Sequence, residues 1–228
     1  MKKIIWLLVL SVFTSHAFGL SIISDLDDTM KVTNVESLPD AARNAIFSKK
    51  SFYQTSEFLN EMKNYTNDLY IVSSSPSFLR KRINSFLEFN KIEVREVILR
   101  NLILDKDSKQ YKIKKIRSIL IENPGEEFIL IGDDTQNDPE VYKIIKKQFS
   151  DRIKGIYIRS IKNSKLPEGV RPFITIFDLV IYENLKGRFE LTESLSIGKS
   201  HLLTLNMEKI IPKFAFCPTE KDHFPAFE

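Results

Sequence analysis

Two aspartates, Asp25 and Asp27, directly follow the apolar run 21–24. Side chains two residues apart point the same way in an extended chain, so both carboxylates can face one site. Two carboxylates this close repel each other unless a cation or a shared proton relieves the repulsion. A hard divalent ion such as magnesium prefers such oxygen ligands. The pair therefore suggests a cation site, with a solvated acidic turn as the alternative. An EF-hand loop is excluded, because its sixth position requires glycine and is Met30 here.

Serines end the next apolar run, 69–72. A hydroxyl group and backbone amides at this point could bind a phosphoryl oxygen, while an ordinary helix-capping turn is the alternative. Ser73 is the first candidate for binding the phosphoryl oxygen. Ser74 takes its place if the strand ends one residue later.

A second acidic group, Asp133, Asp134 and Asp138, follows the run 128–131. Three acids within six residues after a buried strand are costly to hold together without a cation. Lys112 lies near the start of a helical stretch among other lysines, a pattern that usually marks a solvated face. Each group alone is a weak signal, and their shared position at strand ends strengthens it.

The elements that must position these residues alternate along the chain. Apolar runs at 21–24, 69–72, 97–99, 128–131 and 155–158 predict buried strands, and stretches with apolar residues three or four apart predict helices between them. Such alternation predicts an α/β fold, a Rossmann-like three-layer sandwich with a mainly parallel sheet. Its ligand site is expected at the carboxyl ends of the strands.

Local signals mark where the helices begin and end. Ser77 and Ser108 are expected to cap helices, and Asp138 before Pro139 supplies a cap and a first-turn proline. We expect a loop at 163–172, then a strongly apolar helical face over 173–181 that packs in the core or contacts lipid. The tail from Pro212 is expected to be irregular.

The four groups, in this order, resemble the motifs of haloacid dehalogenase-like phosphatases. More narrowly, the segments that resemble the catalytic domain of the actin-patch-protein phosphatidate phosphatase family are SDLDDTMKVTNV, YIVSSSPSFL, YKIKKI and FILIGDDTQNDPEVY. The resemblance covers about residues 21–160 and singles out Lys112 from its neighbouring lysines.

This resemblance implies a magnesium-dependent phosphatase. Asp25 would be the nucleophile that forms an aspartyl-phosphate, and Asp27 the acid and base. Asp25, Asp133 and the backbone carbonyl of Asp27 would hold Mg²⁺, with Asp138 outside the direct ligands or reaching the ion through water. The remaining implied roles are phosphate binding by Ser73 or Ser74 and by Lys112, with Thr29 supporting the phosphate-binding loop.

Two residues depart from the pattern of the family. Tyr111 stands where histidine is expected, and Asp134 where a small residue is usual. Both lie beside motif positions, so we expect them to affect substrate preference more than activity.

The spacing of the motifs predicts a site without a large cap domain, since 47 residues separate Asp25 from Ser73 and 38 separate Ser73 from Lys112. Both intervals are used up by the expected elements. An uncapped site suits a bulky phosphorylated substrate such as a lipid at a membrane surface. The resemblance makes phosphatidate or a related lipid phosphate the first candidate. An exported phosphomonoesterase acting on nucleotides, sugar phosphates or phosphoproteins, and a non-catalytic lipid- or protein-binding module on the same fold, are the alternatives.

The first 19 residues have the pattern of a secretory signal peptide, with Lys2 and Lys3, an apolar stretch from Ile4 to Phe13, and small residues before a cleavage point after Gly19. We therefore expect export to a periplasm or to the medium, and a single domain over 20–228 with a motif-bearing core at 21–160 and a C-terminal helical extension at 165–228. An apolar run this short does not span a bilayer.

Composition limits the other functions. Of 228 residues, 34 are basic and 30 acidic; cleavage would remove two lysines and change the net charge from +4 to +2, well below that of a nucleic-acid binder. One cysteine, Cys217, cannot form an internal disulfide, and few histidines make a structural zinc site improbable. Metal chemistry must therefore depend on oxygen ligands. The oligomeric state is not readable from the sequence.

Overall fold

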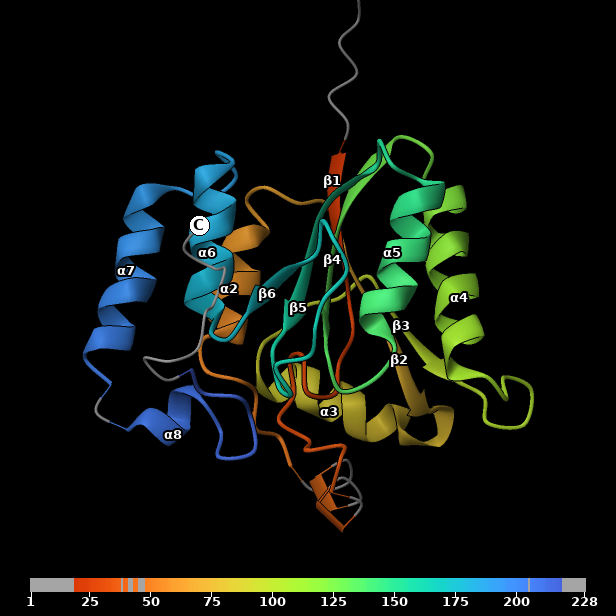
Figure 1. The fold of residues 1–228 in the computed structure, drawn as a ribbon, viewed down its shortest axis with the longest axis horizontal. Helices are drawn as coiled ribbons and strands as arrows, with labels where there is room; N and C mark the ends of the chain where they lie inside the picture. Colours follow the sequence, from red (N-terminus) through yellow and green to blue (C-terminus); the bar gives the residue numbers. More distant parts are fainter. Residues whose placement is uncertain (1–18, 38, 41–42, 45–47, 205, 219–228) are drawn as a thin grey trace, which may run out of the picture.

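The computed structural model describes residues 19–218 except 38, 41–42, 45–47 and 205. A central sheet lies between two helical layers (Figure 1), which confirms the expected three-layer α/β sandwich. The predicted signal peptide lies outside the described residues except for Gly19, which is the first residue of the first strand.

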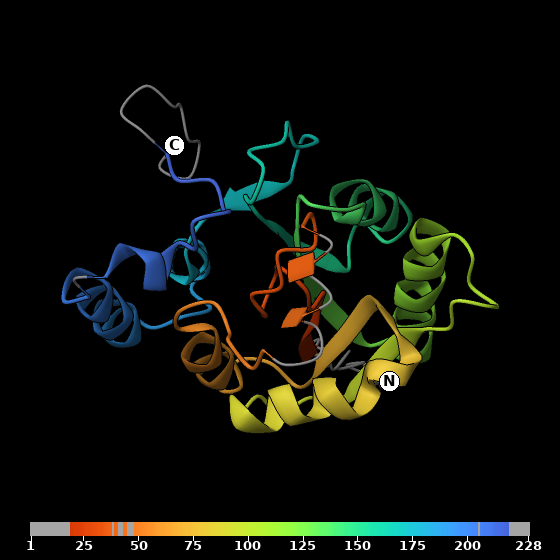
Figure 2. The same cartoon turned by 90° about the horizontal axis from the view of Figure 1, so that it is seen from below.

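The sheet has six strands, all parallel, in the order β3-β2-β1-β4-β5-β6. The strands are β1 (Gly19–Ser24), β2 (Leu69–Pro76), β3 (Glu96–Arg100), β4 (Glu126–Asp133), β5 (Ile153–Arg159) and β6 (Arg171–Phe173). Ser24 is in register with Ile71 of β2 and Ile131 of β4, so the carboxyl ends of these three strands meet. Figure 2 looks onto this edge, and the segment after β1 (red to orange) lies at its centre.

Helices cover both faces because successive strand residues point to opposite sides of the sheet. Ile22 packs in one core with α2 (Thr55–Met62), α3 (Arg80–Phe89) and α6 (Ile176–Leu185). Ile23 packs in the other core with α4 (Ser108–Glu122) and α5 (Asp138–Gln148). Beyond the sheet faces lie the short helix η1 (Ser77–Leu79), α7 (Leu191–Leu202) against α6, and α8 (Met207–Ile210).

The C-terminal extension is part of the sandwich. Phe173, Leu179 and Ile197 share a core with residues of β1 and β2. At the end of β5, the buried Arg159 donates to the carbonyl of Thr29 (2.9 Å) and to that of Ile174 (2.8 Å). Arg159 of β5 therefore links the extension to the loop that follows β1.

Some local expectations are wrong. The cap of α4 is Asp107, whose carboxylate accepts from the backbone N–H groups of Lys109 and Gln110, and Ser108 is the first helical residue. Ser77 begins η1 and caps no helix. The expected loop at 163–172 ends in β6, whose central Pro172 is tolerated because β6 is an edge strand. Three residues including a proline carry no periodic signal, which explains why this strand was missed.

Two further expectations concern insertions and membrane spans. Within the part of the chain that the structure describes, the segments after β1 and β2 contain no second sheet and so build no large cap domain. The same described residues contain no helix that is long and apolar enough to cross a bilayer.

Candidate active site

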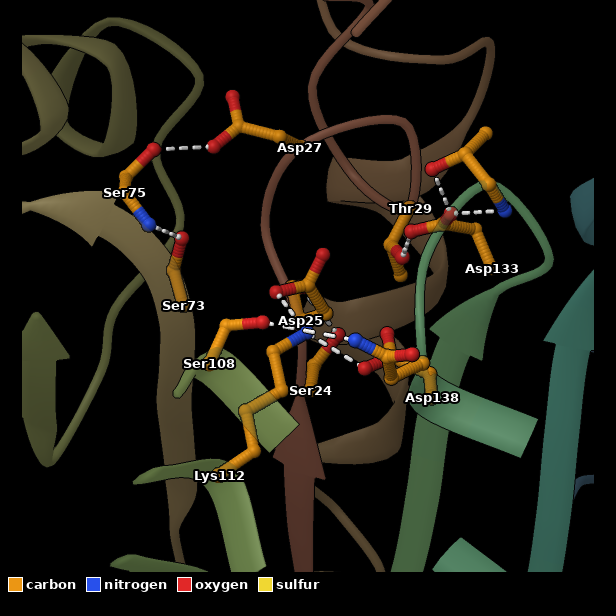
Figure 3. A network of polar contacts seen from close by, with 12 residues as sticks. Ser24, Asp25, Asp27, Thr29, Ser73, Ser75, Ser108, Lys112, Asp133 and Asp138 are labelled. Atoms are coloured by element: carbon orange, nitrogen blue, oxygen red, sulfur yellow. Dashed lines mark hydrogen bonds and ion pairs between the residues drawn. The ribbon is translucent and has the colours of Figure 1, made fainter. Parts of the chain in front are cut away.

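The four groups of candidate residues meet at the carboxyl edge of the sheet (Figure 3). Asp25 directly follows β1, and its backbone N–H donates to the carbonyl of Ile131 in β4 (2.9 Å). Asp133 ends β4, and Lys112 reaches the same point from α4. Residues far apart in the sequence thus form one site, as expected from the parallel topology.

Three aspartates form the centre of this site. One carboxylate oxygen from each of Asp25, Asp133 and Asp138 lies within 4.8 Å of the others, and all three side chains are buried. Lys112 donates to Asp25 Oδ1 (2.9 Å) and to Asp138 Oδ1 (2.5 Å). Its single charge cannot neutralise three carboxylates, so a further cation or a bound proton is needed to relieve their repulsion.

Burial and mutual repulsion perturb the protonation of these groups. Burial, together with the charges of Asp138, Asp133 and Asp27, raises the pKa of Asp25 well above its usual range, although Lys112 opposes this. Burial and Asp138 raise the pKa of Asp133 to about 7. Burial disfavours the charged form of Lys112, but Asp138 and Asp25 together raise its pKa above the ordinary lysine value. The lysine is therefore a permanent cation at neutral pH.

The donor set fits a hard divalent cation. Asp138 Oδ2 is buried and has no hydrogen-bond partner among the described residues, so it is available as a ligand. Gly132 allows Asp138 this close approach, because a Cβ atom at position 132 would lie 2.6 Å from Asp138 Oδ2. Asp138 is also the first residue of α5, with Asn137 at the cap position, so its side chain serves the site and does not cap the helix.

Asp27 faces a different part of the site. Its carboxylate accepts from the hydroxyl of Thr33 at Oδ1 (2.8 Å) and from that of Ser75 at Oδ2 (2.5 Å), away from the three clustered aspartates. Sequence reasoning missed both hydroxyl groups. Ser75 stands in the run of serines that gave Ser73 and Ser74, whereas nothing in the sequence singles out Thr33.

The predicted phosphate-binding residues separate in the structure. Ser73, Ser74 and Asp27 line an open pocket of about 370 Å³ that also reaches Asp25. The Ser73 hydroxyl accepts from the Ser75 backbone N–H (3.0 Å), while the buried Ser74 hydroxyl has no partner among the described residues. The Thr29 hydroxyl donates to Asp133 Oδ2 (2.9 Å), so Thr29 holds this carboxylate in position.

Two further buried acids hold the loops of the site. Asp28, whose backbone adopts a left-handed conformation (φ 58°), accepts from three successive backbone N–H groups at positions 33–35. Asp134 accepts in the same way from Ile161, Lys162 and Ser164. The structure therefore gives Asp134 a role in loop anchoring, where we expected an effect on substrate preference. Tyr111, the other departure, is buried in α4 next to Lys112.

The sheet is parallel, with two aspartates after its first strand, a serine after the second, a helix lysine, and acids after the fourth. This arrangement is similar to the one expected for phosphatases of the haloacid dehalogenase-like class. The model of one family, described as the catalytic domain of phosphatidate phosphatase APP1, matches residues 20–160. The chain belongs to this family, as the sequence motifs suggested.

The chain is similar to two curated proteins, one of which has the name of this family. The chain is 29% identical over 182 residues to an uncharacterised protein of Schizosaccharomyces pombe, covering 69% of this chain and 30% of that protein. It is 28% identical over 163 residues to phosphatidate phosphatase APP1 of Saccharomyces cerevisiae, covering 64% of this chain and 27% of that protein. The chain thus spans less than a third of the length of these relatives.

Among solved structures, the chain resembles a component of the Pnkp1/Rnl/Hen1 RNA repair complex with a TM-score of 0.43 and 17% identity. The match covers 58% of this chain and 40% of that chain.

Proposed function

We propose that this protein hydrolyses phosphatidate or a related lipid phosphate, with Mg²⁺, through a phosphorylated Asp25. The observation that carries the proposal is the buried contact between Asp25 and Lys112 beside a cluster of three carboxylates, at the base of an open pocket. The family assignment supports a phosphatase, and the name of the yeast relative supports phosphatidate as the substrate.

Two successive displacements at phosphorus account for the residues of the site. An oxygen of Asp25 attacks phosphorus, and the bond between phosphorus and the lipid oxygen breaks while Asp27 gives that oxygen a proton. Asp27 then takes a proton from water as the water oxygen attacks phosphorus. The bond to Asp25 breaks, phosphate leaves, and both aspartates return to their starting forms.

The hydroxyl groups around Asp27 suit this role. Thr33 and Ser75 each hold one carboxylate oxygen, so the group that moves the proton is oriented toward the pocket. Asp27 is thereby kept apart from the nucleophile, although only one residue separates them in the sequence.

Mg²⁺ would be held by Asp25, Asp133 and the backbone carbonyl of Asp27, with Asp138 as a direct ligand or through water. When bound, it supplies positive charge that offsets the repulsion between the carboxylates and an anionic substrate. Lys112, together with Ser73 or Ser74, would bind the phosphoryl oxygens as charge develops on them in the transition state.

The form of the pocket supports a bulky substrate. It is open to solvent, and the described insertions build no cap over it, so a lipid headgroup can enter while its acyl chains stay in the bilayer. A small sugar phosphate would be poorly enclosed in such a site.

A phosphate-release assay tests the proposal. Asp25→Asn should lower the turnover of phosphatidate by about a thousandfold or more, because the substituted amide is a poor nucleophile. Glu140→Gln, which neutralises an exposed acid of α5, is the matched control and should retain turnover. Substantial activity in purified Asp25→Asn protein would remove Asp25 from the mechanism.

The same assay distinguishes the substrate classes. Phosphatidate dispersed in detergent is compared with nucleotide, sugar and peptide phosphates, each with Mg²⁺ and with chelator. We expect phosphatidate to be preferred and chelator to abolish turnover. A strong preference for a soluble monoester would contradict the lipid assignment.

We also propose that the protein is exported and acts in a periplasm or outside the cell. The support is the charged, apolar and small-residue pattern of residues 1–19. Cleavage after Gly19 would leave 20–24 to form the first strand beside β4.

A further inference from the structure

Four large apolar side chains are exposed next to the mouth of the catalytic pocket. They are Phe78 of η1, with 77% of its surface exposed, and three residues of the loop after β3, Leu102 (49%), Ile103 (82%) and Leu104 (78%). We call these four residues the apolar rim. Exposing three consecutive aliphatic side chains on one loop is unfavourable in water and marks an interaction site more often than a single exposed residue does.

The two parts of the apolar rim lie on neighbouring strands. Pro76 at the end of β2 is in register with Arg100 at the end of β3, and each part of the rim begins two residues later. Leu79 and Arg100 line the catalytic pocket, so the rim is continuous with its mouth. In Figures 1 and 2 the loop after β3 (yellow-green) extends outward from the body of the molecule.

Hydrogen bonds with the side chains of Arg100 and Asn101 fix the backbone of this loop. Asn101 Oδ1 accepts from the backbone N–H groups of Ile103 (3.0 Å) and Leu104 (3.2 Å). The Arg100 guanidinium donates to the carbonyls of Asp105 (2.7 Å) and Lys106 (2.5 Å). These contacts satisfy backbone groups that would be costly to bury in an apolar medium, while the aliphatic side chains point outward.

Basic residues flank the apolar rim. Arg80, Lys81 and Arg82 follow η1, Lys106 follows the loop, and all four are exposed. None of them forms an ion pair with the residues that the structure describes. The two nearby acids are already engaged, since Asp105 accepts from the Asn101 backbone N–H and Asp107 caps α4. Apolar side chains that project beside unpaired cations fit the interface of an anionic bilayer.

We propose that the apolar rim inserts into an anionic lipid bilayer and brings the catalytic pocket to the membrane surface. A convex loop that satisfies its own backbone suits a deformable lipid medium, whereas a protein partner would need a groove to receive it. The inference rests on the proposed function only in that a lipid substrate gives membrane binding its purpose. Membrane binding itself can be measured without catalysis.

Vesicle sedimentation tests the proposal. The probes are vesicles of phosphatidylcholine with phosphatidylserine, and of phosphatidylcholine alone, neither of which is a phosphomonoester. The wild-type protein should bind the anionic vesicles, and added salt should weaken the binding because screening reduces the attraction to the basic residues. The double variant Ile103→Ser, Leu104→Ser should bind about tenfold more weakly or worse, because it loses most of the apolar contact.

The matched control changes two exposed leucines on the opposite side of the molecule. Leu195 and Leu202 of α7 are exposed by 63% and 87%, and α7 lies far from the loop after β3 in both views. The variant Leu195→Ser, Leu202→Ser should bind vesicles as the wild type does. Both double variants should hydrolyse a water-soluble aryl phosphate at the wild-type rate, which confirms that they are folded.

Three outcomes would overturn the docking proposal. The first is that the wild type does not bind anionic vesicles, and the second is that the wild type and the loop variant bind them equally well. The third is that the wild type runs as a dimer in gel filtration while the loop variant alone runs as a monomer, since the rim would then join two copies of the chain. A different result would show that the docking proposal holds but the proposed lipid substrate is wrong. In that case the loop variant loses vesicle binding, while neither the wild type nor the variants hydrolyse phosphatidate dispersed in detergent.

Discussion

Asp25 and Asp27 are separated by one residue, yet they differ in their surroundings. Asp25 lies among buried acids and a lysine, whereas Asp27 accepts from two hydroxyl groups at the wall of the pocket. In the proposed mechanism the two groups need different environments, because Asp25 must be ionised and Asp27 must change its protonation state during the cycle. Lys112 favours the ionised form of Asp25, and bound Mg²⁺ would offset the neighbouring acids that raise its pKa.

The Ser75 hydroxyl orients Asp27, so Ser75→Ala should impair proton transfer to the leaving group. An alkyl phosphate, whose leaving oxygen must be protonated, should lose about tenfold or more in kcat/KM, within the usual range for general acid catalysis. An aryl phosphate with an acidic leaving group should lose much less. Steady-state kinetics on the two substrates measure the difference.

Ser77→Ala is the control, since Ser77 is an exposed hydroxyl two residues further along the chain. It should leave kcat/KM unchanged for both substrates. If Ser75→Ala lowered turnover of both esters equally, the hydroxyl would have a structural role only.

Individual site residues could be predicted from the sequence where they belong to a specific motif or lie close to their partners along the chain. The carboxylates at positions 25, 27, 133 and 138 were found from their spacing after strands. Asp28 and Asp134 bind the backbone N–H groups of loops, and neither loop's course can be read from one sequence. Thr33 was missed because its orientation depends on the turn that Asp28 organises.

At the scale of elements, α7 is attached to the rest of the molecule partly by aromatic contacts. The half-buried ring of His201 lies against Tyr53 (5.3 Å between centroids) and Phe177 of α6 (5.9 Å). Burial lowers the pKa of His201, so the unfolded chain binds a proton more readily than the folded one. Protonation below about pH 6.5, the ordinary histidine pKa, therefore favours unfolding.

His201→Phe should remove this acid-sensitive contribution while keeping an aromatic ring between α6 and α7. We expect the fall in Tm between about pH 7.5 and about pH 5.5, a range that spans the ordinary histidine pKa, to be smaller in the variant than in the wild type. Thermal melts followed by circular dichroism at the two pH values provide the measurement. Identical falls would show that this histidine does not contribute to the acid sensitivity.

The elements themselves were largely predictable. Five strands were found because buried parallel strands form continuous apolar runs, and the amphipathic helices were found because their apolar residues recur three or four apart. The sixth strand, β6, is held in place by pairing with β5 at the sheet edge, so its own three residues carry no signal. The cap of α4 was misplaced by one residue because Asp107 and Ser108 are both good capping residues.

At the scale of the whole molecule, the buried carboxylates oppose folding until they are neutralised. Mg²⁺ that binds only the folded protein should therefore stabilise it, by about 2.7 kcal/mol at a hundred times its Kd. For a chain of this length we expect a rise in Tm of about 5 to 10 °C, which chelator should reverse. Differential scanning calorimetry measures it independently of turnover.

Asp138→Asn should reduce this rise, because it removes a charge from the cluster, and Glu140→Gln should leave it unchanged. A Tm that does not respond to saturating Mg²⁺ would argue that the three aspartates do not hold the ion.

The strand order also determines when the site can form during synthesis. Thr29 and Asp133 are 104 positions apart in the sequence, and Asp25 and Lys112 are 87 apart. Contacts of such long range form only after the intervening chain has been made and β4 has paired with β1. A nascent chain would thus contain the proposed nucleophile well before the lysine and the acids that surround it, so chains that stop short of residue 138 should be catalytically silent.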